Sequence, residues 1–464
     1  MRGRGQLLAA LLVLAAGVAG GAYLDREVGA RPLGPAPEGS ANSGAWLGPH
    51  GGGRGWRVQL ALANPGPEPV RVRLTALSAR RPAPPRELEV PPGNEVRVEV
   101  PALAPEASTY AEFFGGWVAA GWVAQAEGQA SGVAAEPCLP GPAGRFLLPD
   151  GNTERGEETA LLVMNPFAAD AVLTITLLTE EGAPVTTKEW SDVVLPAHRS
   201  AIFAVNEVKL GERTVSAVVD VGVGRVGAAS LGFTGEERRI RSVVGATGLL
   251  ARAVLPGWSG TGQSELILTN PAGERNLRVA VSVLGSEGAR AAEGLEEVEV
   301  GPSSAITAPV PVEGPSALDV QAEAGGPGLA AARRIPGVSG DPAAFGTASP
   351  AGAWVVLPTV AGRPSHPRLV LANPGAEPIA VRLQALPPPG SAGVPAPVTV
   401  EVPARATVSA PGAFVEALPG AAVLAVAEEG TFLAASASTS LGREGLAGHA
   451  AALGVAVPAR WVSR

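Results

Sequence analysis

An Asn-Pro pair that closes an alternating apolar segment occurs four times along the chain and constrains the fold more than any other feature. The asparagines are Asn64, Asn165, Asn270 and Asn373, at separations of 101, 105 and 103 residues. So steady a period indicates repeated units of about a hundred residues each. The length of 464 residues agrees, because domains of about 100 to 150 residues predict three or four of them.

Each repeat has the pattern of several short strands. A second alternating run follows each Asn-Pro pair and ends at Leu77, Leu178, Leu284 or Leu386. A third strand, a turn and a fourth strand come next, and a pair of small-residue strands ends the unit. We therefore expect at least six strands in each repeat. Period-two alternation gives a strand one buried and one wet face, which favours antiparallel sheets.

The sequence thus predicts an all-β protein of four tandem immunoglobulin-like β-sandwich repeats. The cores should be small and β-branched, because the apolar residues are mainly Ala, Val and Leu and only 4% of the chain is aromatic. A four-bladed propeller is the alternative, but a blade normally uses about 40 to 50 residues, half of one repeat here. The expected repeats are 45–143, 144–250, 251–352 and 353–464.

The N-terminal segment has the features of a membrane anchor. Arg2 and Arg4 precede an uncharged run from Leu7 to Leu24, which as a helix would span about 27 Å. Positive charge before the run keeps the N-terminus inside and predicts export of the rest. A cleaved signal peptide is the alternative, because small residues at Ala19–Ala22 could present a cleavage site.

These features predict a single-pass protein of the cell membrane whose C-terminal part is extracytoplasmic, or a secreted protein if the signal is cleaved. The segment after the run is rich in Pro, Gly, Ala and Ser and predicts a tether. The expected parts are a cytoplasmic basic stub at 1–6, a transmembrane signal anchor at 7–24 and a Pro/Gly-rich linker at 25–44.

The charge and the single cysteine exclude several classes of function. A formal net charge of −8 argues against nucleic acid as a partner. The one basic cluster, Arg238, Arg239 and Arg241, follows two glutamates and predicts a solvated loop. A lone Cys138 forbids an intrachain disulfide and a multi-cysteine metal site. We expect it to be buried or idle, and an intermolecular bridge stays open.

A G-x-G-x-x-G pattern at Gly222, Gly224 and Gly227 is a candidate for a nucleotide site. Such a site needs a helix after the glycines. The residues that follow have a strand pattern, so we interpret the glycines as a hairpin turn.

The titratable residues form no pattern that points to catalysis. The histidines, His50, His198, His366 and His449, are scattered without metal-ligand spacing, and we expect them on the surface. Asp150 and Asp220 are interpreted as turn residues. The sequence therefore predicts no catalytic, cofactor-binding or metal-binding residues, no cofactor and no enzyme activity.

An aromatic cluster in the first repeat is the least ordinary local feature. Phe113, Phe114, Trp117 and Trp122 lie within ten residues. On an exposed loop they could stack on sugar rings. The favoured interpretation is that alternate members fill the first core, because aromatic side chains tend to be buried.

The second repeat resembles a known but uncharacterised family. Its segments FLLPDGNTERGEETALLVMNPFAADAVLTITLLTEEG and VVLPAHRSAIFAVNEV are similar to the Asn-Pro repeats of secreted or membrane-anchored actinobacterial proteins, a domain of unknown function. The resemblance covers Phe146–Val223 well and the other repeats more loosely. It implies a surface or envelope role and supplies no catalytic residues.

The leading hypothesis is a non-enzymatic extracytoplasmic envelope protein, a tethered β-sandwich scaffold or spacer for protein interactions. The alternative is a glycan-binding module that uses the aromatic cluster; a hydrolase with carboxylates assembled between domains is less favoured. The expected partners are the membrane, through the N-terminal helix, and an envelope protein or glycan, with no nucleic acid. The Asn-Pro pair itself is expected to be a structural corner.

Overall fold

The computed structural model is all-β, as predicted. It describes residues 43–80, 82, 84–259, 262–336, 342–345, 349–359, 365–418, 420–441 and 447–461. The helices in this part are short: α2 (Gly412–Glu416) and the 3-10 turns η1 (Lys188–Trp190), η2 (Val205–Glu207) and η3 (Ala459–Trp461).

The predicted stub at 1–6 and signal anchor at 7–24 lie outside the described residues, as does the linker up to residue 42. The first strand begins at Ser43, two residues before the expected start of the first repeat. None of the helices in the described part combines the length and the apolar character needed to cross a membrane.

In its described residues the first repeat contains eight strands in two four-stranded antiparallel sheets, in agreement with the expectation of at least six. The sheet orders are β1-β6-β3-β4 and β5-β2-β7-β8. The strands are β1 (Ser43–Gly48), β2 (Trp56–Ala63), β3 (Val70–Leu77), β4 (Arg86–Val90), β5 (Glu95–Val100), β6 (Ser108–Phe114), β7 (Ala119–Ala126) and β8 (Gly132–Pro137).

The second repeat has the same eight strands in the same arrangement. Its sheet orders are β12-β11-β14-β9 and β13-β10-β15-β16. The strands are β9 (Arg145–Leu148), β10 (Glu157–Asn165), β11 (Ala171–Thr179), β12 (Val193–Leu195), β13 (Arg199–Ala204), β14 (Val215–Val223), β15 (Gly227–Thr234) and β16 (Arg239–Val244).

The third repeat keeps this arrangement and adds one strand, β20, beside β19. Its sheet orders are β17-β23-β19-β20, with β21 also paired to β19, and β22-β18-β24-β25. The strands are β17 (Arg252–Ser259), β18 (Gln263–Asn270), β19 (Leu277–Gly285), β20 (Gly288–Ala291), β21 (Val298–Val300), β22 (Ser304–Pro311), β23 (Gly314–Ala322), β24 (Ala330–Pro336) and β25 (Pro342–Phe345).

The fourth repeat also keeps it and adds β34 beside its first strand. Its sheet orders are β29-β28-β31-β26-β34 and β30-β27-β32-β33. The strands are β26 (Ala353–Val356), β27 (Ser365–Asn373), β28 (Ile379–Leu386), β29 (Val398–Val402), β30 (Ala406–Ser409), β31 (Ala422–Ala427), β32 (Leu433–Leu441), β33 (Ala447–Leu453) and β34 (Val455–Ala456).

The strand order does not confirm the immunoglobulin-like part of the prediction. An immunoglobulin domain places its first strand beside its second and its sixth beside its seventh. Here β1 pairs with β6, and β2 pairs with both β5 and β7. Strand β3 pairs with β4, so the first six strands pair as β1 with β6, β2 with β5 and β3 with β4. This is the pairing of one long hairpin whose strands are divided between two sheets.

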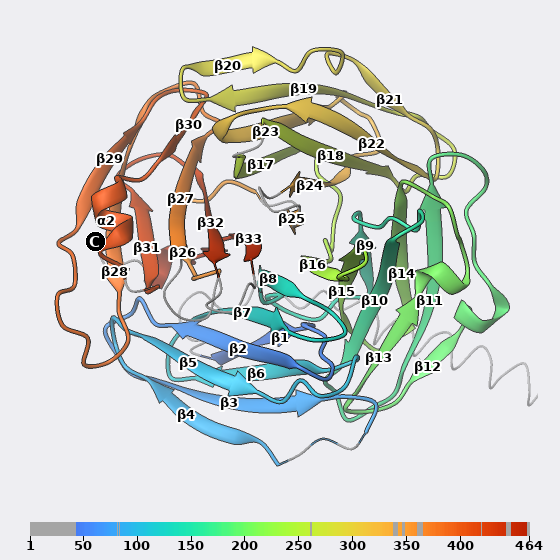
Figure 1. The fold of residues 1–464 in the computed structure, drawn as a ribbon, viewed down its shortest axis with the longest axis horizontal. Coiled ribbons are helices and arrows are strands. Elements are labelled where there is room, and N and C mark those ends of the chain that lie inside the picture. The colour runs from blue at the N-terminus through green and yellow to red at the C-terminus, as the bar shows by residue number, and fades with distance from the viewer. Residues whose placement is uncertain are drawn as a thin grey trace, which may run out of the picture. The chain divides into compact units, whose positions relative to one another are not determined.

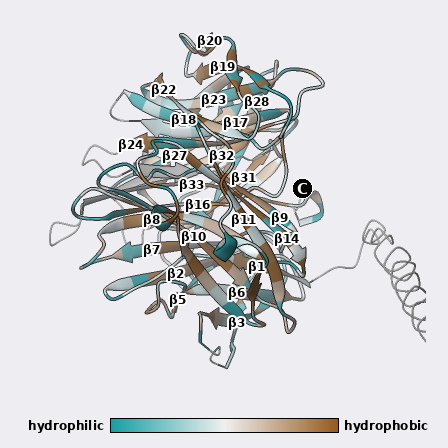
Figure 2. Ribbon diagram, turned by 90° about the vertical axis from the view of Figure 1, so that its right-hand side faces the viewer, coloured by the Kyte–Doolittle hydropathy of each residue, from teal (hydrophilic) through white to brown (hydrophobic). Residues whose placement is uncertain are grey.

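The two sheets of each repeat enclose one apolar core. In the second repeat, Phe146, Ile175 and Val219 come from one sheet and Leu161 and Ala228 from the other, and all five are at most 1% exposed within one cluster. Hydrophobic colour accordingly follows the strands (Figure 2). Full burial of such an aliphatic or aromatic side chain contributes about 1.5–3 kcal/mol, so this core stabilises the pair of sheets. Leu47, Leu77 and Leu139 of the first repeat belong to the same cluster, so the core continues into the neighbouring repeat.

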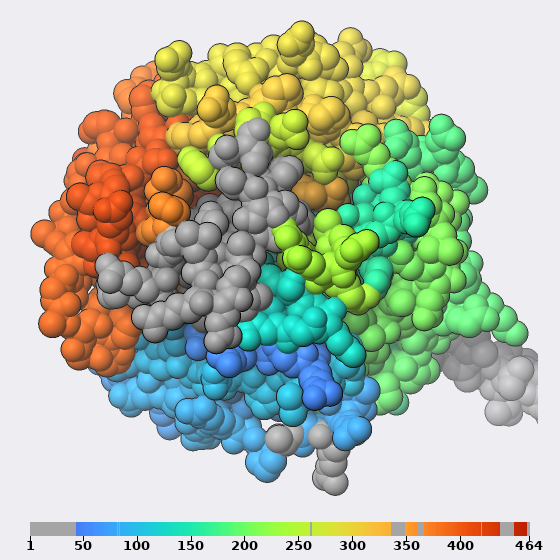
Figure 3. Space-filling view, viewed as in Figure 1, coloured from blue at the N-terminus to red at the C-terminus, as the bar shows by residue number. Residues whose placement is uncertain are grey.

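The four repeats of residues 43–464 follow one another around a common centre in chain order (Figures 1 and 3). One equivalent strand from each repeat lies at this centre, namely β8, β16, β25 and β33. Strand β8 contacts β16 and β33, and β25 contacts the same two strands. Propeller blades also surround an axis, but each repeat here contributes two sheets instead of one. The structure is therefore a closed ring of sandwich-like repeats.

The first and last repeats close the ring through buried polar contacts. The Asn94 Nδ2 and Glu95 backbone N–H groups both donate to the Pro387 carbonyl, at 2.9 and 3.0 Å. The Glu95 carboxylate, fully buried, accepts the Ala422 N–H at 2.6 Å and pairs with Arg97. Burial raises the pKa of Glu95, and the Arg97 charge opposes that rise.

Hydrogen bonds also join the other neighbouring repeats. They link the first repeat to the second, the second to the third and the third to the fourth. The pairs are Ser200 Oγ to the Glu106 carbonyl at 2.5 Å, Ser216 with Thr269 at 2.7 Å, and Arg252 to the Pro374 carbonyl at 3.0 Å.

The Asn-Pro pair is a structural corner, as predicted, and it also joins the two sheets of its repeat. Asn165, 1% exposed at the end of β10, donates from Nδ2 to the carbonyls of Ala169 and Leu195 at 2.8 and 3.1 Å. Its Oδ1 accepts the Phe167 N–H at 3.1 Å. Leu195 ends β12, a strand of the opposite sheet. One amide therefore closes the turn and bridges the sandwich.

The other three repeats reproduce this bridge. In each, the asparagine amide donates to the carbonyl of the last residue of the opposite-sheet strand, at 3.1 or 3.2 Å. The pairs are Asn64 with Val90, Asn270 with Val300 and Asn373 with Val402.

We predict that Asn165→Ala destabilises the second repeat by about 2–4 kcal/mol, because each buried backbone group left unpaired costs about 1–3 kcal/mol. Asn165→Asp keeps an acceptor but places a carboxylate oxygen against the carbonyls of Ala169 and Leu195, so at neutral pH a loss at least as large is expected. Thermal and urea unfolding of the full chain measure both. The control is Asn276→Ala at an exposed position, and equal stability of the Asn165 and Asn276 variants would contradict the bridge.

Candidate functional site

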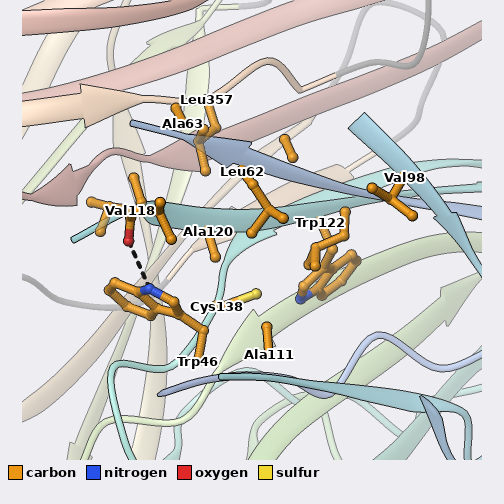
Figure 4. Packing of buried hydrophobic residues seen from close by; sticks show 14 of the residues in the cluster. Trp46, Leu62, Ala63, Val98, Ala111, Val118, Ala120, Trp122, Cys138 and Leu357 are labelled. Atoms are coloured by element: carbon orange, nitrogen blue, oxygen red, sulfur yellow. Dashed lines mark hydrogen bonds between the residues drawn. The ribbon is translucent and has the colours of Figure 1, made fainter. Parts of the chain in front are cut away.

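The aromatic cluster of the first repeat is mostly part of its core. Phe113, Trp117 and Trp122 are 7%, 7% and 1% exposed, whereas Phe114 is 37% exposed. The Trp46 ring packs against Phe113 and Trp117. Its N–H donates to the Val118 carbonyl at 2.8 Å (Figure 4). The cluster therefore does not present a set of open rings for stacking on a sugar.

The G-x-G-x-x-G glycines lie between two strands, as predicted, but not in a hairpin. Gly222 is in β14, and Gly227 begins β15. These strands belong to different sheets, so the segment is a crossing between sheets. Gly224 has φ +80, a conformation that favours glycine, which explains the residue type at this position without a phosphate.

His50 corrects the expectation of surface histidines. It is fully buried, its Nε2 lies 2.9 Å from Thr109 Oγ1 and its Nδ1 donates to the Gly51 carbonyl at 2.7 Å. Burial lowers the pKa of His50 to about 4, although the Gly51 hydrogen bond opposes the shift. His198 is half-buried and His366 exposed; the side chain of His449 lies outside the described part.

The acidic residues interpreted as turn residues are also corrected. Asp220 lies within β14 and pairs with Arg145 at 3.2 Å near the surface. Asp150 follows β9 but is 2% exposed, and its Oδ2 accepts the Arg241 Nε–H at 3.0 Å. Its Oδ1 accepts a hydrogen bond from Arg334. Asp150 is thus a buried ion-pair partner.

Arg241, expected on a solvated loop, lies in β16 and is 2% exposed. Only its neighbours Arg238 and Arg239 keep substantial exposure. Arg241 also contacts Glu157 at 3.1 Å, and Arg334 contacts Glu265 at 2.7 Å.

These ion pairs form one network between two repeats. The second repeat contributes Asp150 and Arg241, and the third contributes Arg334. Burial alone would raise the pKa of Asp150, but the Arg334 and Arg241 charges outweigh it and lower this pKa to about 2. Two guanidinium groups therefore keep the carboxylate charged inside the protein.

A cavity of about 490 Å³ opens where the innermost strands end. Its walls come from all four repeats: Trp46, Glu136 to Pro140, Val244 to Gly248, Leu250, Ser349, Trp354 and Leu453 to Ala456. Cavities of about 300–1,000 Å³ commonly hold small ligands, so this is the candidate site.

Glu136 is the polar residue that distinguishes this cavity. It is 2% exposed, and within the described part its Oε1 has no hydrogen-bond partner. Burial raises the pKa of Glu136 well above its ordinary value, and the negative charge of Asp150 raises it further. Among the described lining residues Glu136 is the single carboxylic acid. The neighbouring Cys138 is a buried free thiol, as expected.

Sequence reasoning did not find Glu136, although one signal was present. The strand GVAAEP is otherwise small and apolar, so its glutamate breaks the pattern at a position that should be buried. The described part contains no group of three or more His, Cys, Asp or Glu side chains placed to hold a metal ion.

We predict that His50 makes stability depend on pH between about 6.5 and 4. Its folded-state pKa is below the unfolded value, so its contribution is complete above 6.5 and is lost as pH falls toward 4. A shift of this size corresponds to about 3 kcal/mol. When urea unfolding is measured across this pH range, the free energy of unfolding should change less with pH for His50→Gln than for the wild type. The control His198→Asn, at a half-buried histidine, should show the same change of unfolding free energy with pH as the wild type.

Asp150 should make stability depend on pH in a lower pH range than His50 does. Its folded-state pKa is about 2, so its stabilisation is complete above about 4 and lost as pH falls through 2. We predict that Asp150→Asn removes this dependence and lowers stability at pH 7 by about 3–5 kcal/mol, because two buried cations lose their partner. Unfolding midpoints at pH 7 and pH 3 test this; an unchanged midpoint at pH 7 would contradict the ion-pair network.

The comparisons with known proteins identify a family of unknown function. A search of curated proteins finds no match. The model of a family of unknown function, DUF5719, matches residues 111–361, which include the whole second and third repeats. Because the match extends over more than half of its length, the chain belongs to this family of unknown function, DUF5719.

Proposed function

We propose that this protein is a non-enzymatic extracytoplasmic scaffold of the cell envelope that holds protein partners on a rigid ring. The observation that carries the proposal is the closed ring. Each repeat contacts two neighbours, and the first and last repeats are joined through buried Glu95. A body closed in this way presents its loops at fixed positions, which suits a platform better than a flexible chain of separate domains.

The charge distribution supports the same proposal. The buried charges of Asp150, Arg241 and Arg334 pair with one another between two repeats. Their ion pairs join the second repeat to the third. This use of charge supports a structural role for these residues over a catalytic one.

The compartment is proposed from the sequence. A basic stub followed by a long apolar run favours a signal anchor with the ring outside the membrane. The resemblance to Asn-Pro repeats of secreted or membrane-anchored actinobacterial proteins supports an envelope role. A ring tethered by a Pro/Gly-rich linker would be held near the membrane and still be able to turn.

The scaffold is favoured over the glycan-binding alternative by the burial of its proposed residues. Trp117 and Trp122 lie in the core, and Phe114, the most exposed member of the cluster, already has Arg73 6.0 Å from its ring centroid. The hydrolase alternative needs two carboxyl groups at one cleft, and Glu136 stands alone among the described lining residues of the central cavity.

We predict that the full chain, with an epitope at its C-terminus, stays in the membrane fraction and that the epitope is reached by antibody on intact cells. Alkaline extraction should leave the chain in the membrane pellet. Release into the medium with a new N-terminus near Ala22 would show a cleaved signal peptide. An epitope reached only after the membrane is broken would contradict export.

The same tagged protein tests the scaffold. Cross-linking on intact cells followed by purification should recover an envelope protein with the wild type and much less of it with Glu95→Ala, which removes a ring-closing carboxylate. The matched control is Glu189→Ala at an exposed position. Recovery of the same partner at the same level with Glu95→Ala would count against a role for the closed ring, provided that unfolding curves confirm the ring is weakened.

A further inference from the structure

The central cavity combines apolar walls with one buried acid. Trp46 in β1 and Trp354 in β26 stand in the first strands of the first and fourth repeats, and both line the cavity with Leu139 and Val455. The remaining repeats contribute the segments after β16 and before β26. Since no single repeat could form this space, it exists only in the closed ring.

Glu136 is the unsatisfied group of the cavity. Its residue is 2% exposed, and Oε1 has no hydrogen-bond donor among the described residues. A buried polar atom without a partner costs about 1–3 kcal/mol. The other buried acids do not share this condition: Asp150 has Arg241 and Arg334, and Glu95 has Arg97 and a backbone N–H. Glu136 therefore stands out as the acid that lacks a donor.

The cavity walls have few donors to offer. The N–H of Trp46 is used by the Val118 carbonyl, and the N–H of Trp354 by the Phe432 carbonyl, both at 2.8 Å. Figure 4 shows the first of these bonds. Burial raises the pKa of the Cys138 thiol, so this neighbour is held neutral. The hydroxyl groups of Thr247 and Ser349 also line the cavity, but no described residue donates to Glu136 Oε1. A molecule that enters the cavity can therefore supply the missing donor.

We propose that the central cavity binds a small organic ammonium ion, a protonated amine with an apolar or aromatic body. The ammonium group would donate to Glu136 and supply the positive charge that this acid lacks. The apolar body would lie among Leu139, Val455 and the two tryptophans, whose rings also attract cations. A neutral molecule of the same shape would fill the space but bring no positive charge to stabilise the Glu136 carboxylate.

Proton release gives the proposal a second signature. Burial and the nearby Asp150 charge raise the pKa of Glu136, which keeps its carboxyl protonated at neutral pH when no cation is near. Binding of an ammonium ion favours the carboxylate, so the carboxyl proton passes to the buffer while the amine keeps its own. The number of protons released should approach one per protein. This inference does not rest on the scaffold role or on the compartment.

The test compares tryptamine with tryptophol, which replaces the ammonium group by a hydroxyl, on the full-length protein by calorimetry at pH 7. We expect tryptamine to bind at least tenfold more tightly. Glu136→Gln should remove this difference and keep the weak binding of tryptophol. The matched control Glu189→Gln, at an exposed glutamate outside the cavity, should bind like the wild type.

Repeating the titration in two buffers of different ionisation enthalpy measures the released proton. Release with the wild type and none with Glu136→Gln supports the proposal. Equal affinity for the two probes, or no binding of either by protein with a normal unfolding midpoint, overturns it. If Glu136→Gln does not fold, the wild-type probe comparison and its proton release still decide the question.

Discussion

The asparagine side chain that bridges the two sheets of each repeat is the interaction on which the remaining structure depends. Proline has no N–H to donate to a neighbouring strand, so it is placed where the strand leaves its sheet. The asparagine before it supplies the missing donors at that corner. In the second repeat, Asn165 reaches from the end of β10 to the end of β12 in the opposite sheet. This bond fixes the distance between the sheets and hence the size of the core.

Once four such sandwiches are fixed in shape, their innermost strands can meet. The contacts between repeats are partly apolar, because Val133 and Ala135 of the first repeat pack with Ala450 and Ala452 of the fourth, and partly charged. Asp150 lies between arginines of two repeats and joins the second repeat to the third. Arg333, fully buried, donates its N–H groups to the carbonyls of Leu255 and Ser316 and to Ser264, and so joins the two sheets of the third repeat. Burial lowers the pKa of Arg333 to about 9.

The sequence predicted what is local and repeated, and missed what arises between repeats. Alternation and the Asn-Pro period led to four all-β units, because both depend on neighbours within one unit. His50, Asp150 and Arg241 were expected at the surface or in turns, since their sequence surroundings are those of loops. Their burial comes from contacts with distant strands; Asp150 and Arg334 are 184 positions apart. The strand order was missed for the same reason, because alternation does not tell which strands are paired, and Glu136 became a candidate only when the ring placed its strand at a cavity.

Ring closure between the ends of the chain has a consequence for how the protein forms. Glu95 belongs to the first repeat, but the backbone N–H that it accepts belongs to Ala422, 327 positions later. During synthesis the first repeat therefore exists for a long interval with a carboxylate still in water that will later be enclosed. Contacts between such distant positions slow folding, because the chain entropy is lost before the contact is gained. Closure of the ring must therefore wait until the last repeat has been synthesised.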